Sequence, residues 1–330
     1  MELMTRIDIP VSEWKMEAGA KVLLVGSCFA DAVGEKLRRG GFEAMVNPFG
    51  TLYNPASIAV SLLRSVSEKE VAIPLAAKWG GFRASKSESG TSVGRSRGHR
   101  LADVGDIVFE GVDGVWHSWM HHSCFSSADV VTLVERINST THRVADFLRE
   151  ADVLIVTLGT AVIYRLKESG MLVSNCHKQP DSLFVRERMS AYDIVDQWQM
   201  LLQLLESVNP RLKVIFTVSP IRHKRDGYHA NQVSKGILLQ AVDAMVGVDG
   251  VSRGDCSKGQ RSYFPSYEIM MDELRDYRFY ADDMIHPSAQ AVEYIWRRFQ
   301  DTYMDNRTKD AVETARKYCE RRQHRTIVDS

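Results

Sequence analysis

Three short runs of apolar residues stand out along the chain, at residues 22–25, 153–157 and 214–218. Each run is continuous rather than alternating, which is typical of parallel strands that helices cover on both faces. The stretches between them repeat apolar residues every three or four positions, the spacing of helices that bury one side. Strands that alternate with helices predict an α/β fold with a mainly parallel sheet.

The predicted helices have recognisable ends. The first follows the 22–25 run, places Ala30, Val33 and Leu37 on one face, and ends at the Gly40–Gly41 pair. Others are predicted at 127–148, 191–205, 231–245 and after Pro287. A further strand is expected around residues 42–46, and a hairpin before Asn175.

Composition places the chain among ordinary globular proteins. It has 330 residues, of which 44% are hydrophobic and 25% charged, and Lys+Arg and Asp+Glu both total 42. A neutral chain lacks the broad positive surface of a nucleic-acid-binding protein. It also has no run of 18 apolar residues. We therefore expect no nucleic-acid partner and no membrane insertion.

Cysteine and histidine usage argues against disulfides and metals. The five cysteines are scattered without a CxxC pair, and the histidines are dispersed without an HExxH sequence. No cofactor or metal is therefore expected. The first twenty residues are polar and lack the apolar core of a signal peptide. Together with the free cysteines, this predicts a cytoplasmic protein.

Two segments depart from the globular pattern. The segment 84–101 includes SKSESGTSVGRSRGHR, whose one large apolar residue is Val93. It is typical of an exposed inserted loop, although its serines and arginines also suit a phosphate. Residues 306–330 end in a basic stretch and are predicted to form a C-terminal helical tail. Residues 1–305 are predicted to be a single domain that carries the insertion.

A strand, a tight turn and a helix meet in VLLVGSCFADAVGEKL. Ser27 follows Gly26 at the carboxyl end of the strand, the edge where open α/β sheets bind ligands. Free N–H groups and the helix dipole stabilise negative charge there, so Ser27 is a candidate nucleophile. Two alternatives remain. Ser27 serves only as a helix cap, or Cys28 is the nucleophile, although we expect its side chain to point elsewhere.

A second candidate site lies just before the last amphipathic helix, in FYADDMIHPSAQAVEYIWRRF. His286 is suited to act as the general base for a serine. Asp283, three residues earlier, is placed to orient the imidazole and stabilise its protonated form, with Asp282 as a competitor. The alternative is an aspartate that caps the helix beside a surface histidine.

The chain contains, in order, GSCFADAVGEKL, NPFGTLYNP, SWMHHSCF, VTLGTAVIY, NCHKQP, TVSPIRHKRDG and YFPSYEIMMDELRDYRFYADDMIHPS. Together these segments resemble the GSCFA family, a branch of the SGNH (GDSL-like) hydrolases, and residues 26–30 spell the family name. The resemblance runs from about residue 22 to about residue 299. It implies a three-layer α/β/α sandwich of flavodoxin-like character.

The resemblance also implies roles for the two candidate sites. The superfamily's first block maps its nucleophilic serine to Ser27, and its last block, Asp-x-x-His, maps to Asp283 and His286. Its oxyanion hole combines the N–H groups of the serine and a glycine, here Gly50, with an asparagine side chain. Where that asparagine is expected, this chain has Leu158, Gly159, Thr160 and Ala161. Thr160 is our candidate substitute, and Asn54 and Asn175 are alternatives.

Several other residues, most of them polar, follow predicted strands or lie in loops, and we expect them to line a substrate pocket. They are His122, His177, Gly159, Asn54 and the run Arg222, His223 and Lys224. Arg222 or Lys224 is suited to hold a substrate carboxylate or phosphate. The alternative is that these side chains form structural hydrogen bonds that hold long loops over the sheet.

The expected function is that of a serine ester hydrolase acting through Ser27, His286 and Asp283. Superfamily analogy points to O-acyl or O-acetyl esters of small molecules or carbohydrates as substrates. One alternative is an acyltransferase that uses the same triad with a sugar hydroxyl as acceptor. The other is a binding module that keeps the scaffold without catalysis. The sequence leaves the oligomeric state open.

Overall fold

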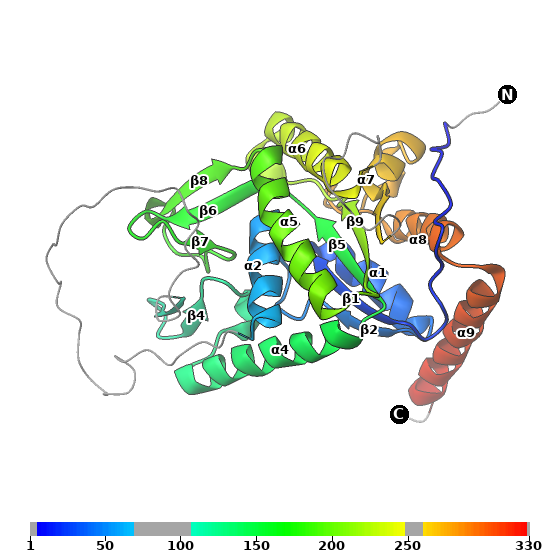
Figure 1. Ribbon diagram of the computed structural model, residues 1–330, viewed down its shortest axis with the longest axis horizontal. Coiled ribbons are helices and arrows are strands. Elements are labelled where there is room, and N and C mark those ends of the chain that lie inside the picture. The colour runs from blue at the N-terminus through cyan, green and yellow to red at the C-terminus, as the bar shows by residue number, and fades with distance from the viewer. Residues whose placement is uncertain (1–4, 69–106, 248–259, 329–330) are drawn as a thin grey trace, which may run out of the picture.

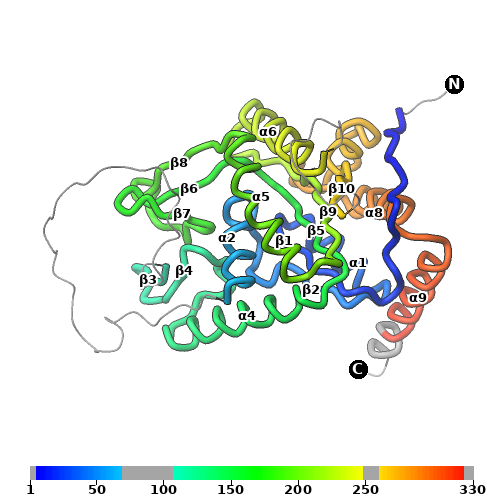
Figure 2. The backbone as a smooth tube through the Cα atoms, in the orientation of Figure 1, coloured from blue at the N-terminus to red at the C-terminus, as the bar shows by residue number. Residues whose placement is uncertain are grey.

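The computed structural model describes residues 5–68, 107–247 and 260–328. Its centre is a parallel sheet in the order β10-β9-β5-β1-β2 (Figures 1 and 2). The strands are β1 (Lys21–Gly26), β2 (Glu43–Val46), β5 (Val153–Leu158), β9 (Lys213–Val218) and β10 (Arg261–Phe264). In chain order this sheet reads 2-1-3-4-5, the flavodoxin-like arrangement. The predicted fold class is therefore confirmed.

Helices cover both faces of this sheet (Figure 1). On one face lie α1 (Cys28–Arg39) and α8 (Ala289–Tyr303), and α9 (Asn306–Val328) packs against α1. On the other lie α2 (Pro55–Val66), α4 (Val130–Glu150), α5 (Ala191–Val208) and α6 (Tyr228–Val246). Because side chains alternate along a strand, Val22 and Leu24 pack toward α1 and α8, while Leu23 and Val25 pack toward the opposite layer.

Helix α2 is the main-layer helix that the hydrophobic pattern did not predict. Asn54 caps its first turn, and Pro55 begins it. Its buried side includes Ser57, Ser61 and Ser65 together with apolar residues. Serines on the buried face interrupt the apolar stripe that reveals a helix in a sequence.

A smaller region extends from the main sheet beside α2 and one end of α4 (Figures 1 and 2). It contains the hairpin β3 (Val108–Glu110) and β4 (Trp116–Ser118), and an antiparallel sheet of β6 (Val162–Leu166), β7 (Leu172–Val173) and β8 (Phe184–Arg188). Trp119, Phe184, Leu133 and Ile137 are central to its separate apolar core, which we call the satellite core. The β6–β7 pair is the hairpin expected before Asn175.

Short helical turns complete the connections. They are η2 (Ser123–Phe125), η3 (Asp181–Leu183), η4 (Lys224–Asp226), α7 (Ser266–Glu268), the π-helical η5 (Ile269–Glu273) and η6 (Tyr277–Phe279). The segment 84–101, expected to be an exposed insertion, lies outside the described residues. No helix within the described ranges is long and apolar enough to cross a membrane.

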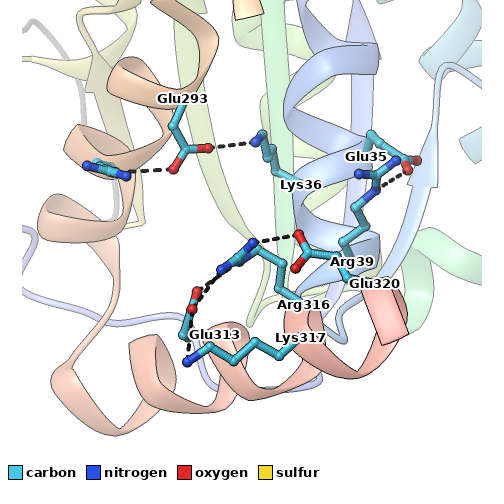
Figure 3. A network of polar contacts seen from close by, with 9 residues as sticks. Glu35, Lys36, Arg39, Glu293, Glu313, Arg316, Lys317 and Glu320 are labelled. Atoms are coloured by element: carbon cyan, nitrogen blue, oxygen red, sulfur yellow. Dashed lines mark hydrogen bonds and ion pairs between the residues drawn. The ribbon is translucent and has the colours of Figure 1, made fainter. Parts of the chain in front are cut away.

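Ion pairs join α1 to α8 and also lie within α1 and within α9 (Figure 3). Lys36 of α1 contacts Glu293 of α8 at 2.6 Å, and Arg316 joins Glu313 and Glu320 within α9. These side chains are partly exposed, and each such pair contributes at most about 1 kcal/mol. The position of α1 is therefore set mainly by its buried apolar face, which includes Phe29 and Leu37.

Candidate active site

Ser27 lies where β1 turns into α1. Gly26 has a φ of 138°, and a Cβ there would lie 2.1 Å from the carbonyl oxygen of Thr157, so glycine is required. The Ser27 N–H donates to that oxygen at 3.0 Å, and the Ser27 hydroxyl accepts the Phe29 N–H at 3.4 Å as the helix cap. Ser27 is only 1% exposed. The turn thus holds a buried hydroxyl at the start of α1.

Asn47, directly after β2, stabilises this turn through two side-chain hydrogen bonds. Its side-chain oxygen accepts the Gly26 N–H at 2.9 Å, and its amide nitrogen donates to Asp31 at 2.9 Å. Its φ of 42° is in the left-handed region, which asparagine tolerates better than most residues. Sequence reasoning did not single out Asn47. The signal was present, because an asparagine before Pro48 and Phe49 is typical of a turn.

Asp283 and His286 form a hydrogen-bonded pair in the loop before α8. The imidazole Nδ1 donates to Asp283 Oδ2 at 2.6 Å, and the N–H groups of Ile285 and His286 donate to Oδ1 at 2.8 and 2.9 Å. The His286 N–H, followed by its side chain and the Ile285 N–H, lowers the pKa of Asp283 to about 2. The carboxylate therefore stays ionised and fixes the imidazole with Nε2 facing away from it.

The Nε2 atom of His286 lies 3.4 Å from the Sγ of Cys28. The expectation that Cys28 points elsewhere is therefore wrong, because the first turn of α1 directs its side chain toward the histidine loop. Burial raises the pKa of the Cys28 thiol, and the nearby Asp31 and Asp283 raise it further. The thiol is thus held in its protonated form. Ser27, one residue earlier, shares the same helix end but turns its hydroxyl toward Phe29.

The three N–H groups predicted to hold an oxyanion donate to carbonyl oxygens of the protein. Ser27 binds Thr157 as above, and the Gly50 N–H donates to Asn47 at 2.8 Å. The Thr160 N–H donates to the carbonyl oxygen of Tyr53 at 3.0 Å. The Thr160 hydroxyl lies 3.0 Å from the Ser234 hydroxyl. In this conformation, therefore, none of these three N–H groups is directed at a substrate.

Gly159, directly after β5, lies against Tyr53, His223 and Ser27, which come from three different parts of the chain. A Cβ on Gly159 would lie 2.9 Å from the carbonyl oxygen of Tyr53, 3.0 Å from His223 Nε2 and 3.5 Å from Ser27 Cβ. A side chain there would collide with the backbone of the Tyr53 loop and with the imidazole. The absence of a side chain at Gly159 thus brings His223, from the loop after β9, next to the serine.

His223 has an unusual environment. Its Nε2 is buried and has no hydrogen-bond partner within the described part of the chain. Burial lowers the pKa of His223 to about 4, with contributions from Lys235 and His286, so the ring is neutral at pH 7. Its own N–H donates to the side-chain oxygen of Asn231 at 3.0 Å, and its ring meets the Tyr53 ring edge-on at 5.5 Å. Sequence reasoning named His223 only within a polar run.

Lys235 lies beneath the site and was not identified from the sequence. It is fully buried on α6, and its ammonium donates to the carbonyl oxygens of Gly159 at 2.8 Å and Ser219 at 2.6 Å. Burial lowers the pKa of Lys235 to about 7. It ties together the chain segments that follow β5 and β9. A lysine in an amphipathic helix ordinarily marks a solvated face, so the sequence gave no warning.

Arg222 and Asn54 also lie at the carboxyl edge of the sheet. The Arg222 guanidinium stacks over the Tyr280 ring at 4.2 Å. The Arg222 backbone N–H donates to the Ile285 carbonyl oxygen at 3.3 Å, which ties this loop to the His286 loop. The Asn54 side-chain oxygen accepts the Ser57 N–H at 2.8 Å as the cap of α2. Both residues thus support loops that border the site.

His122 and His177 occupy different places. His122 packs against Gly50, where a Cβ would lie 2.2 Å from the His122 Cβ, and its Nδ1 accepts the Cys124 N–H. His177 lies beside the satellite core, where its Nε2 donates to the carbonyl oxygen of Ser118 at 2.8 Å. The structure therefore does not bring His177 next to Ser27. Among the residues with described positions, no three His, Cys, Asp or Glu side chains cluster as metal ligands would.

Comparison with models of protein families identifies the family of this chain. The model of the GSCFA family matches residues 21–101 and 93–299, which is most of the sequence. The chain belongs to the GSCFA family. In this GSCFA protein the residues that spell the name, 26–30, form the turn from β1 into α1 that carries Ser27 and Cys28.

Other comparisons add little. No curated protein matches the sequence. Among solved structures, this GSCFA protein is similar to a carbohydrate esterase of family 3 from Talaromyces cellulolyticus, with 14% identity and a TM-score of 0.25. The match covers 45% of this chain and 55% of that one. With so low a TM-score, the likeness bears on neither the fold nor the function of the GSCFA protein.

Proposed function

We propose that this GSCFA protein is a serine hydrolase that cleaves O-acyl esters, with Ser27 as nucleophile. The observation that carries the proposal is the Asp283–His286 pair, whose imidazole Nε2 is directed at the start of α1. A base oriented by a carboxylate beside a hydroxyl is the arrangement that activates serine. In this proposal Asp283 holds the tautomer of His286, and His286 moves the proton.

The reaction proceeds in two steps, acylation of Ser27 and hydrolysis of the acyl-serine. His286 Nε2 takes the Ser27 hydroxyl proton as Oγ bonds to the ester carbonyl carbon, and the carbonyl electron pair moves onto its oxygen. The intermediate collapses, the alcohol leaves with the proton from His286, and an acyl-serine remains. Water then attacks the acyl-serine by the same route, which releases the carboxylic acid and restores Ser27.

Two features support Ser27 over its neighbour. Ser27 lies directly after β1 and next to Gly159 and His223, where the chain segments after β5 and β9 converge. Cys28 has a thiol whose pKa is raised by burial, whereas a cysteine nucleophile needs a lowered one. The Ser27 hydroxyl only accepts a long 3.4 Å contact from Phe29, so a rotation about χ1 toward His286 breaks no short hydrogen bond of this oxygen.

Cys28 is the second candidate nucleophile, because its Sγ is the atom that lies 3.4 Å from His286 Nε2. In that case the same Asp283–His286 pair would generate a thiolate and a thioester intermediate. The chemistry would still be acyl transfer, but the serine assignment would be wrong.

A fluorophosphonate probe separates these two candidates, because the nucleophile displaces fluoride and keeps the phosphonyl group. We expect the wild type and Cys28→Ala to be labelled, and Ser27→Ala and His286→Ala to remain unlabelled. Labelling of Ser27→Ala together with loss in Cys28→Ala would assign the reaction to the thiol. Equal labelling of all four proteins would contradict the proposal entirely.

The acyl acceptor is tested with the same proteins. Small acetate esters and an acetylated carbohydrate serve as donors, with or without an added sugar alcohol. A hydrolase releases acetate whatever the sugar concentration. Transfer of the acetyl group to the sugar, at the expense of free acetate, would instead identify an acyltransferase.

A further inference from the structure

The proposed ester cleavage needs a group that stabilises negative charge on the carbonyl oxygen. During the attack of Ser27, a full charge develops on that oxygen, and donors aimed at it supply much of the rate enhancement. The N–H groups of Ser27, Gly50 and Thr160 donate to the carbonyl oxygens of Thr157, Asn47 and Tyr53. Another donor close to Ser27 is therefore required.

The imidazole of His223 is in the right place. Its Nε2 and the Cβ of Ser27 lie 3.0 and 3.5 Å from one point, the position that a Cβ on Gly159 would occupy. Both atoms therefore lie against Gly159. His223 Nε2 is buried without a hydrogen-bond partner among the residues that the structure describes. A buried polar atom is nearly always paired, so an unpaired one beside a nucleophile indicates a ligand that completes it.

We propose that His223 is a catalytic residue of this site, whose Nε2–H binds the oxyanion that forms when Ser27 attacks the ester. This inference rests on the proposed function and adds to it the donor that the three engaged N–H groups do not supply. No proton moves between His223 and substrate. The hydrogen bond only strengthens as the charge develops, while the proton of Ser27 goes to His286.

The surroundings of His223 suit this role. The titratable and charged groups that act on it are Lys235 of α6 and His286 of the loop before α8, and the Tyr53 ring packs against its edge. Burial and these two bases keep the imidazole neutral. In its Nε2-protonated tautomer a neutral ring can donate, yet it does not compete with His286 for the serine proton. The Asn231 side chain anchors its backbone N–H.

The test compares two amides at one position. A glutamine amide reaches the position of the imidazole Nε2, whereas an asparagine amide stops near that of Nδ1. We expect His223→Asn to lower kcat by about 100- to 1,000-fold with little change in KM, which is the effect of losing one oxyanion donor. His223→Gln should retain activity within about tenfold of the wild type. The control is His229→Asn, at an exposed histidine on α6, which should leave kcat unchanged.

Four outcomes overturn the proposal, and the last of them also refutes the proposed function. Wild-type kcat in His223→Asn, in a protein whose Ser27 is labelled by fluorophosphonate, would remove His223 from catalysis and leave the proposed function intact. Loss of the acid limb of the pH–rate profile in His223→Asn would make His223 the base rather than the oxyanion donor. Equal losses in His223→Gln and His223→Asn, with lowered melting temperatures, would indicate a structural role. Absence of Ser27-dependent labelling in the wild type would instead refute the proposed function, and this inference with it.

Discussion

Histidines in two regions of this GSCFA protein contrast in what surrounds them. At the carboxyl edge of the central sheet, His286 is paired with an ionised carboxylate, and His223 presents an unpaired Nε2 next to Ser27. Beside the satellite core, His121 and His177 bond to Ser118, through its hydroxyl at 2.8 Å and its carbonyl oxygen at 2.8 Å.

The satellite histidines share two features with His223 and His286 of the candidate site. The Nδ1 of His177 is also buried and has no partner in the ranges 5–68, 107–247 and 260–328, and His117 lies 3.4 Å from the carboxylate of Asp113. The two regions differ in the side chains that surround the histidines. The ring of His177 is surrounded by the rings of His117, Phe109 and Trp119 rather than by a nucleophile. An unpaired nitrogen or a nearby carboxylate is therefore not enough to propose catalysis, and what distinguishes His223 and His286 is that Ser27 and Cys28 lie beside them.

The largest contrast is expected between the two carboxylates. Asp283→Asn should reduce kcat by about 10⁴-fold, because an amide no longer fixes the tautomer of His286. The matched change Asp113→Asn, beside His117, should leave kcat within about twofold of the wild type, since surface substitutions of this kind are nearly neutral. Steady-state kinetics on an acetate ester decides this, and similar losses in both variants would erase the distinction between the two regions.

Glycines next to the two groups of histidines give the second contrast. Gly159→Ala should lower kcat by about 100-fold, because the new Cβ would displace His223 and the Tyr53 loop by a fraction of an ångström. A Cβ on Gly111 would meet the side chains of Asp113 and His117, at 2.5 and 2.8 Å, and these can move aside. Gly111→Ala should therefore keep wild-type kcat. Full activity in Gly159→Ala would show that the convergence at Gly159 is not needed for turnover.

The third contrast separates stability from catalysis. His177→Asn should leave kcat unchanged and lower the free energy of unfolding by about 0.5–1.5 kcal/mol, because the Ser118 carbonyl oxygen loses one of its two donors and keeps the His121 N–H at 3.2 Å. Urea denaturation measures this change. A kcat as low as that expected for His223→Asn would assign the satellite histidines to the active site after all.

The last contrast concerns pH. Burial lowers the pKa of His121 from its usual 6.5 to about 3, so the folded protein keeps it neutral while the unfolded chain gains a proton. Its contribution to stability is complete above pH 6.5 and is lost progressively as the pH falls toward 3. His121→Gln should flatten the decline between pH 6 and 4.5 by about 1.4 kcal/mol per pH unit. Parallel stability curves for the wild type and His121→Gln would show that His121 is not buried as a neutral ring.

Much of the fold was predictable because local patterns encode it. Apolar runs indicated β1, β5 and β9, and the Gly40–Gly41 pair indicated the end of α1. Helix α2 escaped prediction because its buried face carries serines. The strands of the satellite region are short and partly exposed, so only the hairpin of β6 and β7 was expected.

The candidate site was predictable where its chemistry is local in sequence. Asp283 and His286 are three residues apart, and the structure joins them through one loop. The placement of Cys28 was not predictable, because the direction of a side chain in a first helical turn depends on what packs around it. The oxyanion donors were predicted by analogy with glycine and threonine positions whose N–H groups donate to the protein instead.

Hydrophobic periodicity and turn residues were therefore sufficient for the α/β class, for β1, β5 and β9, and for the turn that carries Ser27. They could not reveal the contacts of His223, Gly159 and Lys235, which come from chain segments that follow different strands. Those contacts exist because parallel strands end at one edge of the sheet and a residue without a side chain leaves room there. Burial at that edge then sets the protonation of His223 and Lys235, a property that depends on the folded surroundings rather than on neighbours in the chain.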